Sequence, residues 1–239
     1  MNLFYSQEVD NTQCVLGNEE SKHAIRVLRL KLGDEIHVTD GKGSLYVGNI
    51  SSTDNKLCSV EILRKLHDEN RRSSKIHIAI APTKSNSRFE WFLEKACEIG
   101  IDTITPIMCE HSERRKLPEG RLDKILIGAM KQSQNLYLPV LNPTTTLEAF
   151  LSSSVLDTTN TFLASYEKGN SDLASECIAG NDALVLIGPE GDFSESEIER
   201  AGSFGIPNVN LGQTRLRTET AAIVAVHTIS LLNNQLLKR

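Results

Sequence analysis

The feature that most limits the fold is the order of apolar runs from residue 76 onward. Short apolar runs, of the kind that form buried strands, alternate there with segments of helical spacing. The runs cover residues 76–82, 102–108, 161–166, 183–188 and 208–212. Continuous apolar strands separated by helices are typical of a parallel sheet with helices on both faces. We therefore predict an α/β fold for this part of the chain.

The sequence predicts where several helices of this part begin or end. Apolar residues recur at helical spacing over residues 89–99, and Gly100 is expected to end that helix. A second helix is expected over residues 122–130. Ser194 and Glu197 form an S-x-x-E capping box, which predicts a helix that ends near Gly205. A long final helix follows.

The first 66 residues have a different pattern, with short alternating strands. Residues 35–40 and 44–50 flank an Asp40-Gly41 hairpin signal, and residues 57–63 predict another strand. One helix is expected over residues 21–32, ended by Gly33. This segment is too short for a sandwich, so we predict a small β-barrel. A polar stretch at residues 67–75 serves as linker, which divides the chain into domains 1–70 and 71–239.

Composition limits where such a chain can act. No apolar run reaches the ~18–20 residues of a membrane span, and the first residues lack the pattern of a signal peptide. The five cysteines are scattered without a C-x-x-C pair, and the six histidines lack metal-ligand spacing. We expect a cytoplasmic protein with reduced thiols, no metal and no membrane partner.

The charge balance argues against a broad basic surface. The net charge is −5, and residues 1–75 are neutral with 11 basic and 11 acidic residues, so the remainder carries all of it. Nucleic-acid binders usually present an extended basic field. Any contact with nucleic acid must therefore come from local clusters.

Two glycine-containing loops follow strands of the predicted parallel sheet, where ligands of such sheets bind. They are Gly188-Pro189-Glu190-Gly191-Asp192 and the segment that begins at Gly212. Glu190 and Asp192 would repel a pyrophosphate, and the chain has no Gly-rich dinucleotide fingerprint and no Walker lysine. A ligand with a cationic centre, an adenine and no phosphate fits better, and S-adenosylmethionine is such a molecule. Taken alone, the first loop could also be a plain strand–helix turn.

Four motifs in order resemble one known family. IGPEGDF (187–193) and LGQTRLRTETA (211–221) look like the cofactor loops of the ribosomal RNA (uracil-N(3))-methyltransferases, the RsmE family of the SPOUT superfamily. HAIRVLR (23–29) is similar to that family's H-x-x-x-V-L-R helix, and KACEIG (95–100), followed by Pro106, is similar to its K-A-x-E-L-G segment. The resemblance covers the whole chain.

The resemblance implies a PUA-like RNA-binding barrel and a SPOUT α/β domain with a C-terminal trefoil knot. It further implies a homodimer that methylates a uridine of 16S ribosomal RNA within the small ribosomal subunit, with free RNA as the alternative substrate. Residues 128–135 depart from the family's pattern. Lys131 stands where the family commonly has an acidic residue, and Asn135 stands where it commonly has an arginine. From that segment only Gln132 is kept as a candidate.

Candidate site residues follow from the loops and the resemblance. Methyl transfer to the uracil nitrogen places negative charge on the flanking carbonyl oxygens, which a cation stabilises. Arg217 is the candidate for that role, and Glu219 could orient the arginine, bind cofactor, accept the proton or complement the helix dipole. The candidates for cofactor binding are Ala164, Ser165, Gly188, Glu190, Gly191, Leu211, Gly212, Leu216 and Thr220.

Basic residues supply the RNA candidates. Lys22, Arg26 and Arg29 are spaced to share one stripe of the first helix, which could equally be a solvated face. Arg71 and Arg72 with Lys75, and Arg114-Arg115-Lys116, form two further clusters suited to phosphate. The complete set of RNA candidates is Lys22, Arg26, Arg29, Arg71, Arg72, Arg114, Arg115, Lys116, Gln132 and Arg215.

Other functions stay open at this point. A methyltransferase of the same superfamily could act on a tRNA base or on a ribose 2′-hydroxyl. A non-catalytic RNA-binding factor for ribosome assembly could keep the same fold. A nucleotide-dependent oxidoreductase is disfavoured because the chain lacks the phosphate fingerprint.

Overall fold

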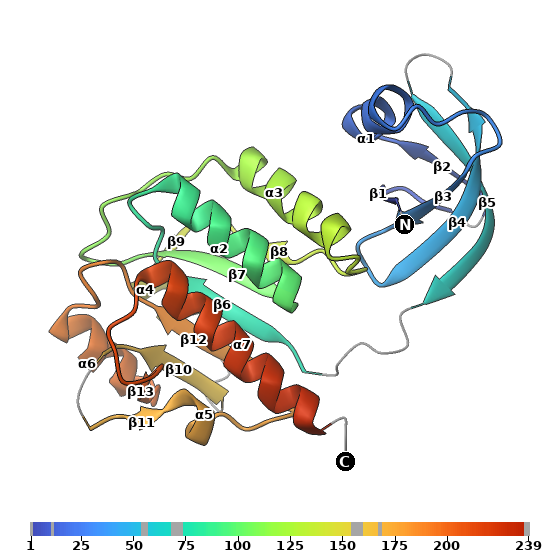
Figure 1. Cartoon of the computed structure of the whole chain (residues 1–239). Helices are drawn as coiled ribbons and strands as arrows, with labels where there is room; N and C mark the ends of the chain where they lie inside the picture. Colours follow the sequence, from blue (N-terminus) through green and yellow to red (C-terminus); the bar gives the residue numbers. More distant parts are fainter. Residues whose placement is uncertain are drawn as a thin grey trace. The chain divides into compact units, whose positions relative to one another are not determined.

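The computed structural model describes residues 2–10, 12–53, 57–67, 74–153, 160–166 and 169–236. The chain folds into two compact units, which Figure 1 shows in sequence colours. The N-terminal unit comprises residues 1–71 and 127–138, and the C-terminal unit comprises residues 72–126 and 139–239. The sequence pattern assigned residues 127–138 to the second domain, whereas in the structure they pack with the first.

The N-terminal unit is built on a five-stranded sheet in the order β1-β3-β4-β5-β2. Its elements are β1 (Leu3–Tyr5), β2 (Gln13–Leu16), α1 (Asn18–Lys22), η1 (His23–Val27), β3 (Glu35–Thr39), β4 (Ser44–Ser52) and β5 (Cys58–His67). β1 pairs with β3 in parallel, and the remaining pairs are antiparallel. The sheet curls around a core that includes Phe4, Leu16 and Val38 (Figure 1). The small β-barrel predicted from the sequence corresponds to this curled five-stranded sheet.

The β3–β4 hairpin forms where the sequence predicted it. The Asp40 carboxylate accepts the backbone N–H groups of Lys42 and Ser44 at 2.7 and 3.2 Å. Gly41 adopts a φ of 71° and Gly43 a φ of 97°, values that favour glycine. The hairpin loop also binds residues 127–138, because Gly43 N donates to Leu136 O at 2.9 Å and Leu138 N donates to Gly41 O at 2.9 Å.

The first helix is shorter than predicted. Regular α1 ends at Lys22, continues as the π-helical turn η1, and leaves the helix at Leu28. The prediction of a helix over residues 21–32 was therefore wrong at both ends. Leaving the helix at this point lets Leu28 and Leu30 pack against the core, and Arg29 takes a left-handed φ of 55°. Arg29 consequently does not share a helical stripe with Lys22 and Arg26.

The replacement of the usual acid by Lys131 has a structural explanation. Lys131 Nζ lies 2.6 Å from Glu20 Oε1, and each side chain is 16% exposed. Glu20 also accepts the backbone N–H of Tyr5 at 3.1 Å, and the Lys131 ammonium group lies over the Phe4 ring. The ion pair thus holds the segment 127–138 against α1 and β1 within the N-terminal unit.

The C-terminal unit contains an eight-stranded sheet in which β11-β13-β10-β12-β6-β7-β8 are neighbours and β9 pairs with β7. All its pairings are parallel, as the sequence predicted. Its elements are β6 (Ile76–Ile80), α2 (Asn86–Ile99), β7 (Thr103–Met108), α3 (Glu119–Gln132), β8 (Val140–Leu141), β9 (Thr145–Thr146), α4 (Leu147–Leu151), β10 (Thr161–Ala164), β11 (Ser171–Asp172), α5 (Leu173–Glu176), β12 (Ala183–Ile187), α6 (Glu195–Ser203), β13 (Asn208–Asn210) and α7 (Thr218–Leu236). The last residues of α3 belong to the N-terminal unit.

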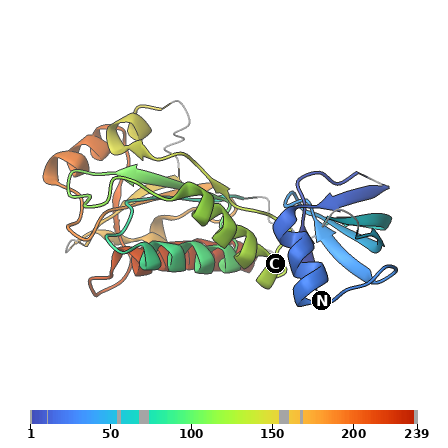
Figure 2. The same cartoon turned by 90° about the horizontal axis from the view of Figure 1, so that it is seen from above.

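Helices cover both faces of this sheet, as Figure 2 shows. On one face α2 and α7 lie side by side over β6, and their buried side chains include Phe89, Phe92 and Ile229. On the other face Phe150 of α4 and Ala201 of α6 pack with residues of β10 and β12. The covered parallel sheet is thereby confirmed. Among the residues described, no helix is long and apolar enough to cross a membrane.

Candidate active site

A pocket opens at the edge of the sheet where three neighbouring strands end. β13, β10 and β12 are adjacent and parallel, so their carboxyl ends meet. The pocket has a volume of about 290 Å³. Its lining consists of Ala164, Ser165, Tyr166, Ile187, Gly188, Pro189, Glu190, Asp192, Leu211, Gly212, Thr214, Arg215, Leu216, Arg217, Thr218 and Ala221. Both glycine loops predicted from the sequence therefore contribute to one pocket.

The first loop, residues 188–194, is a tight turn that leads into α6. Asp192 N donates to Pro189 O at 2.9 Å, and Asp192 has a φ of 65°. A Cβ atom on Gly188 would lie 3.0 Å from the buried ring of Phe193, so any larger residue here must displace that ring. The predicted capping box is present, because Glu197 N donates to Ser194 Oγ and Ser194 N donates to the Glu197 carboxylate.

The second loop, residues 211–217, lies beside the first. Arg215 donates from its guanidinium group to the backbone oxygen of Glu190 at 3.4 Å. Tyr166, at the end of β10, donates its hydroxyl to the backbone oxygen of Gln213 at 3.3 Å. Gly212 has a φ of 130°, which lets the chain turn away from β13.

Most of the predicted cofactor residues lie at the pocket. Ala164, Ser165, Gly188, Glu190, Leu211, Gly212 and Leu216 are in the lining. Gly191 and Thr220 are not in the lining; Gly191 packs against His111 instead. The Glu190 carboxylate accepts the backbone N–H of Lys84 at 2.9 Å, which ties the first loop to the segment that follows β6.

The two catalytic candidates have different surroundings. Arg217 is exposed and lines the pocket together with Arg215. Glu219 is only 6% exposed and does not line it. Its Oε1 lies 3.7 Å from Arg88 Nε on α2, and its Oε2 is buried without a hydrogen-bond partner among the described residues. The structure therefore places the Glu219 carboxylate, on the first turn of α7, against Arg88 of α2.

These elements give the pocket a mixed charge. Glu190 and Asp192 provide carboxylates on one loop, and Arg215 and Arg217 provide guanidinium groups on the other. Glycines leave backbone groups accessible in both loops. Such a pocket can hold a ligand with a cationic centre beside an acceptor that gains negative charge during the reaction.

Family models place this fold and pocket among known proteins. A model described as an RNA methyltransferase domain matches residues 70–230, which includes both pocket loops. The chain belongs to the RNA methyltransferase domain family. A second model, described as an RNA methyltransferase PUA domain, matches residues 16–63. The matched ranges contain most of the C-terminal sheet and most of the curled N-terminal sheet.

Individual relatives of this methyltransferase match over nearly its full length. It is 38% identical to a probable rRNA-methyltransferase from Porphyromonas gingivalis, with a TM-score of 0.91 and coverage of 99% of this chain and 100% of that chain. A ribosomal RNA small subunit methyltransferase E from Neisseria gonorrhoeae, solved bound to S-adenosyl methionine, is 25% identical with a TM-score of 0.86, covering 97% of this chain and 98% of that chain. Ribosomal RNA small subunit methyltransferase E of Rickettsia conorii is 26% identical over 96% of this chain and 94% of its own.

Sequence reasoning missed several pocket residues of the methyltransferase. Tyr166 and Pro189 line the pocket beside predicted neighbours, and Asp192, which the sequence analysis used only for its charge, lines it too. Tyr166 follows Ala164 and Ser165 at the same strand end, so that position alone could have indicated it. Arg88 had no such signal, because 131 positions separate it from Glu219.

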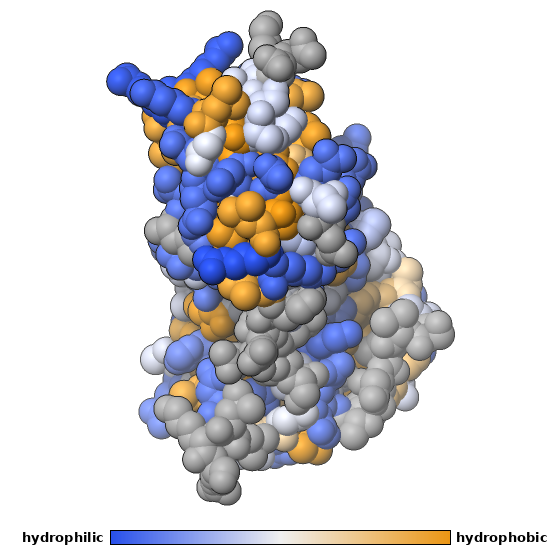
Figure 3. Space-filling view, turned by 90° about the vertical axis from the view of Figure 1, so that its right-hand side faces the viewer, coloured by the Kyte–Doolittle hydropathy of each residue, from blue (hydrophilic) through white to orange (hydrophobic). Residues whose placement is uncertain are grey.

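The predicted RNA residues of the N-terminal unit lie at its surface. Lys22, Arg26 and Arg29 are exposed, and Gln132 is exposed at the end of α3. Val27 and Leu32 beside them are 67% and 64% exposed. Figure 3 shows hydrophobic patches among hydrophilic atoms on the side of the molecule it views. Arg71 and Arg72 lie outside the described residues.

The remaining basic candidates belong to the methyltransferase domain. Arg114 donates from its guanidinium group to the backbone oxygens of Thr83 and Lys84, with the shortest distance 2.6 Å. Arg115 and Lys116 are exposed, as is Lys75. Arg215 lines the pocket. Arg114 thus fixes local backbone, while its two neighbours extend into solvent.

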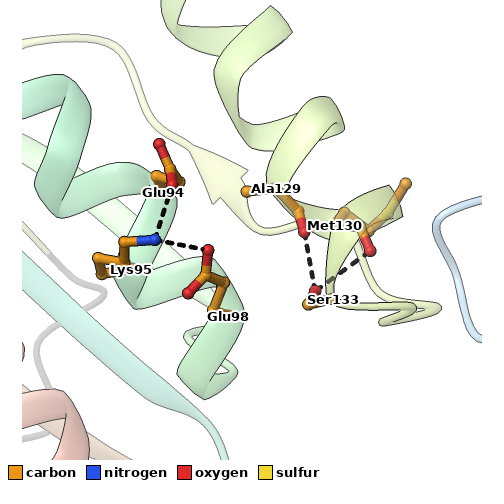
Figure 4. A network of polar contacts seen from close by, with 6 residues as sticks. All are labelled: Glu94, Lys95, Glu98, Ala129, Met130 and Ser133. Carbon is orange, nitrogen blue, oxygen red and sulfur yellow. Dashed lines mark hydrogen bonds and ion pairs between the residues drawn. The ribbon is translucent and has the colours of Figure 1, made fainter.

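Lys95 and Ser133, in two of the segments compared with the family pattern, make contacts within or beside their own helices, as Figure 4 shows. Lys95 Nζ lies 2.7 Å from Glu94 Oε1 and 2.9 Å from Glu98 Oε1 on α2. Ser133 donates its hydroxyl to the backbone oxygen of Ala129 at 2.8 Å, which satisfies a carbonyl at the end of α3.

The cysteines of the methyltransferase offer no nucleophile. All five are free and buried. Burial raises the pKa of Cys14 and of Cys97 to about 12, so these thiols stay protonated near neutral pH.

Proposed function

We propose that this chain transfers a methyl group from S-adenosylmethionine to N(3) of a uridine in 16S ribosomal RNA. The observation that supports this most strongly is the pocket formed by both glycine loops, with Arg215 and Arg217 in its lining. The family match supplies the class of enzyme, and relatives named ribosomal RNA small subunit methyltransferase E supply the substrate.

The residues present suit this cofactor. The lining contains carboxylates at Glu190 and Asp192, which can face the cationic sulfonium, and guanidinium groups at Arg215 and Arg217, which can face the methyl acceptor. Glycine at 188 and 212 leaves backbone groups open for hydrogen bonds with an adenine. When bound, S-adenosylmethionine supplies an electrophilic methyl group, and its sulfonium becomes a neutral thioether.

The chain's own task is alignment and charge stabilisation. The N(3)–CH3 bond forms as the S–CH3 bond breaks, the N(3) proton passes to water, and negative charge develops on the two neighbouring carbonyl oxygens. We assign Arg217 to those oxygens, because it lines the pocket and is exposed. Arg215 binds the backbone of Glu190, which keeps the second loop against the first.

Glu219 acts as a positioning residue in this proposal. Its carboxylate is buried beside Arg88 and does not line the pocket. The pair joins the first turn of α7 to α2, and Arg217 directly precedes α7. We therefore propose that Glu219 sets the position of Arg217 and does not itself accept the proton.

Finer parts of the proposal concern partners and place of action. RNA is held by Lys22, Arg26, Arg29 and Gln132 of the N-terminal unit, and the substrate is the RNA within the small ribosomal subunit.

Two copies form a homodimer, for which Trp91 on α2 and Leu231 on α7 offer apolar surface at 44% and 49% exposure. The reaction takes place in the cytoplasm. Sedimentation analysis of the purified protein tests the dimer.

The decisive experiment compares nucleosides from strains with and without the gene. Mass spectrometry of small-subunit ribosomal RNA is expected to show 3-methyluridine only where the protein is present, and the purified protein is expected to restore it on subunits from the deletion strain. Loss of a modified tRNA base or of a 2′-O-methylribose instead would favour another reaction of the superfamily. Binding of S-adenosylmethionine without turnover on any RNA would favour an assembly factor.

A further inference from the structure

A second depression lies in the C-terminal unit, formed by the segments that follow β6 and β7. It has a volume of about 440 Å³ and is lined by Lys84, Glu113, Arg114, Arg115 and Lys116. Four of these five side chains are basic, in a chain whose net charge is −5. The depression is therefore a local basic site in a part of the molecule that is acidic overall.

This basic depression is joined to the cofactor pocket by hydrogen bonds through Lys84. The backbone N–H of Lys84 binds the Glu190 carboxylate at 2.9 Å, and Glu190 lines the pocket. The backbone oxygen of Lys84 binds the Arg114 guanidinium group at 2.6 Å. The two sites are thus linked through the backbone of Lys84, and both are formed by segments that follow strands of the parallel sheet, where substrates of such folds bind.

Three of the basic groups can reach a ligand. Arg114 is engaged with backbone oxygens, whereas Arg115 and Lys116 are exposed. Lys84 Nζ lies 2.9 Å from Glu113 Oε2, but the two side chains are 72% and 55% exposed. An exposed ion pair of this kind is weak, so an RNA phosphate can draw Lys84 away from Glu113.

We propose that this basic depression binds a backbone phosphate of the RNA, next to the nucleotide that enters the cofactor pocket. The proposal rests on the proposed RNA methylation and adds a subsite to it. Lys84, Arg115 and Lys116 contact the phosphate, Arg114 holds the backbone that presents Lys84, and Glu113 competes for Lys84 when no RNA is bound. A phosphate contact beside the cofactor pocket fixes the register of the strand without reading its sequence.

Because Lys84 and Glu113 carry opposite charges, substitutions at the two positions are expected to change RNA affinity in opposite directions. RNA affinity and single-turnover methylation are measured with small ribosomal subunits over a salt series, at saturating S-adenosylmethionine. Lys84→Ala is expected to weaken RNA binding about tenfold and to reduce the salt dependence by about one phosphate contact. Glu113→Gln is expected to strengthen binding about twofold, because it frees Lys84 and removes a repelling charge. Lys124→Gln, an exposed lysine on α3, is the matched control and is expected to bind as the wild type does.

Cofactor binding separates this proposal from a structural role. The hydrogen bond from Lys84 to Glu190 uses backbone N–H, so it survives Lys84→Ala, and calorimetry is expected to show unchanged affinity for S-adenosylmethionine. Equal weakening of RNA binding by Lys84→Ala and Glu113→Gln would show that only their ion pair matters, which overturns the subsite. Wild-type RNA affinity and salt dependence in Lys84→Ala also overturn it. If inorganic pyrophosphate abolishes RNA binding equally in wild type and Lys84→Ala, the anion site lies elsewhere. If the wild type methylates no RNA, the proposed function itself fails, whatever the variants do.

Discussion

The two loops of the cofactor pocket are held in different ways. The first loop is fixed by the Asp192–Pro189 turn, by the Lys84–Glu190 hydrogen bond and by the buried Phe193, and it leads into the capping box of α6. The second loop is exposed over residues 212–215. Its contacts with Glu190 O and Tyr166, at 3.4 and 3.3 Å, are near the upper limit for hydrogen bonds.

This difference indicates a division of tasks. A loop fixed before binding holds its ligand at little cost in conformational entropy, whereas a loosely held loop can close over a ligand and complete the site. The first loop therefore acts as the preformed half of the pocket. The second loop brings Arg217 to the reacting groups. Changes in the first loop should affect both stability and binding, and changes in the second should affect binding or turnover while stability is kept.

The largest effect is expected from Arg217→Ala. Removing a group that stabilises developing negative charge typically lowers turnover by roughly 10²–10³-fold. Arg217 is exposed, so the melting temperature is expected to stay within about 1 °C of the wild type. Single-turnover methylation and thermal unfolding measure the two quantities. Arg217→Lys, which keeps the charge, should recover part of the rate, and wild-type turnover in Arg217→Ala would show that this loop carries no catalytic group.

The parallel sheet that carries both loops is expected to lose stability in acid. His77 lies on β6, and burial lowers its pKa to about 4 from 6.5. The folded state therefore binds fewer protons than the unfolded state, so this contribution to stability is complete above pH 6.5 and is lost as the pH falls through 4. The loss amounts to roughly 3 kcal/mol at most, from about 1.4 kcal/mol per pKa unit. Denaturant unfolding between pH 7 and 4 measures it, and His77→Gln should show a flatter profile. If the free energy of unfolding falls equally with pH in wild type and in His77→Gln, His77 does not cause the acid sensitivity.

Sequence patterns predicted most of the scaffold and both loops, because these depend on local rules. Apolar strands alternating with helices predicted the parallel sheet, and the carboxyl ends of parallel strands must meet, so the loops at Gly188 and Gly212 could be placed together. The exit from the helix at Leu28 depends on packing against a core built later in the chain. The ion pairs Lys131–Glu20 and Arg88–Glu219 join residues far apart in sequence, which periodicity does not show. The trefoil knot, the RNA contacts and the assignment of catalytic roles stay predictions.

A pair of glycine substitutions compares the two loops directly. Gly188→Ala places a Cβ against the buried Phe193 ring, and overpacking of this kind costs about 1–3 kcal/mol. Thermal unfolding should show the loss of stability, and calorimetry should show weaker cofactor binding. Gly212→Ala meets no atom within 4 Å, but its φ of 130° strains an alanine. The exposed loop can relax that strain, so binding should weaken while stability is kept. A larger stability loss in Gly212→Ala than in Gly188→Ala would reverse the proposed order of rigidity.

The smallest effect is expected from Ser194→Ala, which removes one half of the capping box. Its hydroxyl accepts the backbone N–H of Glu197, and loss of such a cap costs about 1 kcal/mol. For a chain of this size that corresponds to a fall of roughly 2–4 °C in melting temperature. Glu197 also accepts the backbone N–H of Glu110 at 2.8 Å, so the start of α6 keeps a second anchor. Cofactor affinity should therefore change less than twofold. If affinity falls tenfold while Ser194→Thr binds normally, the first loop depends on this one hydrogen bond and is less preformed than its other contacts indicate.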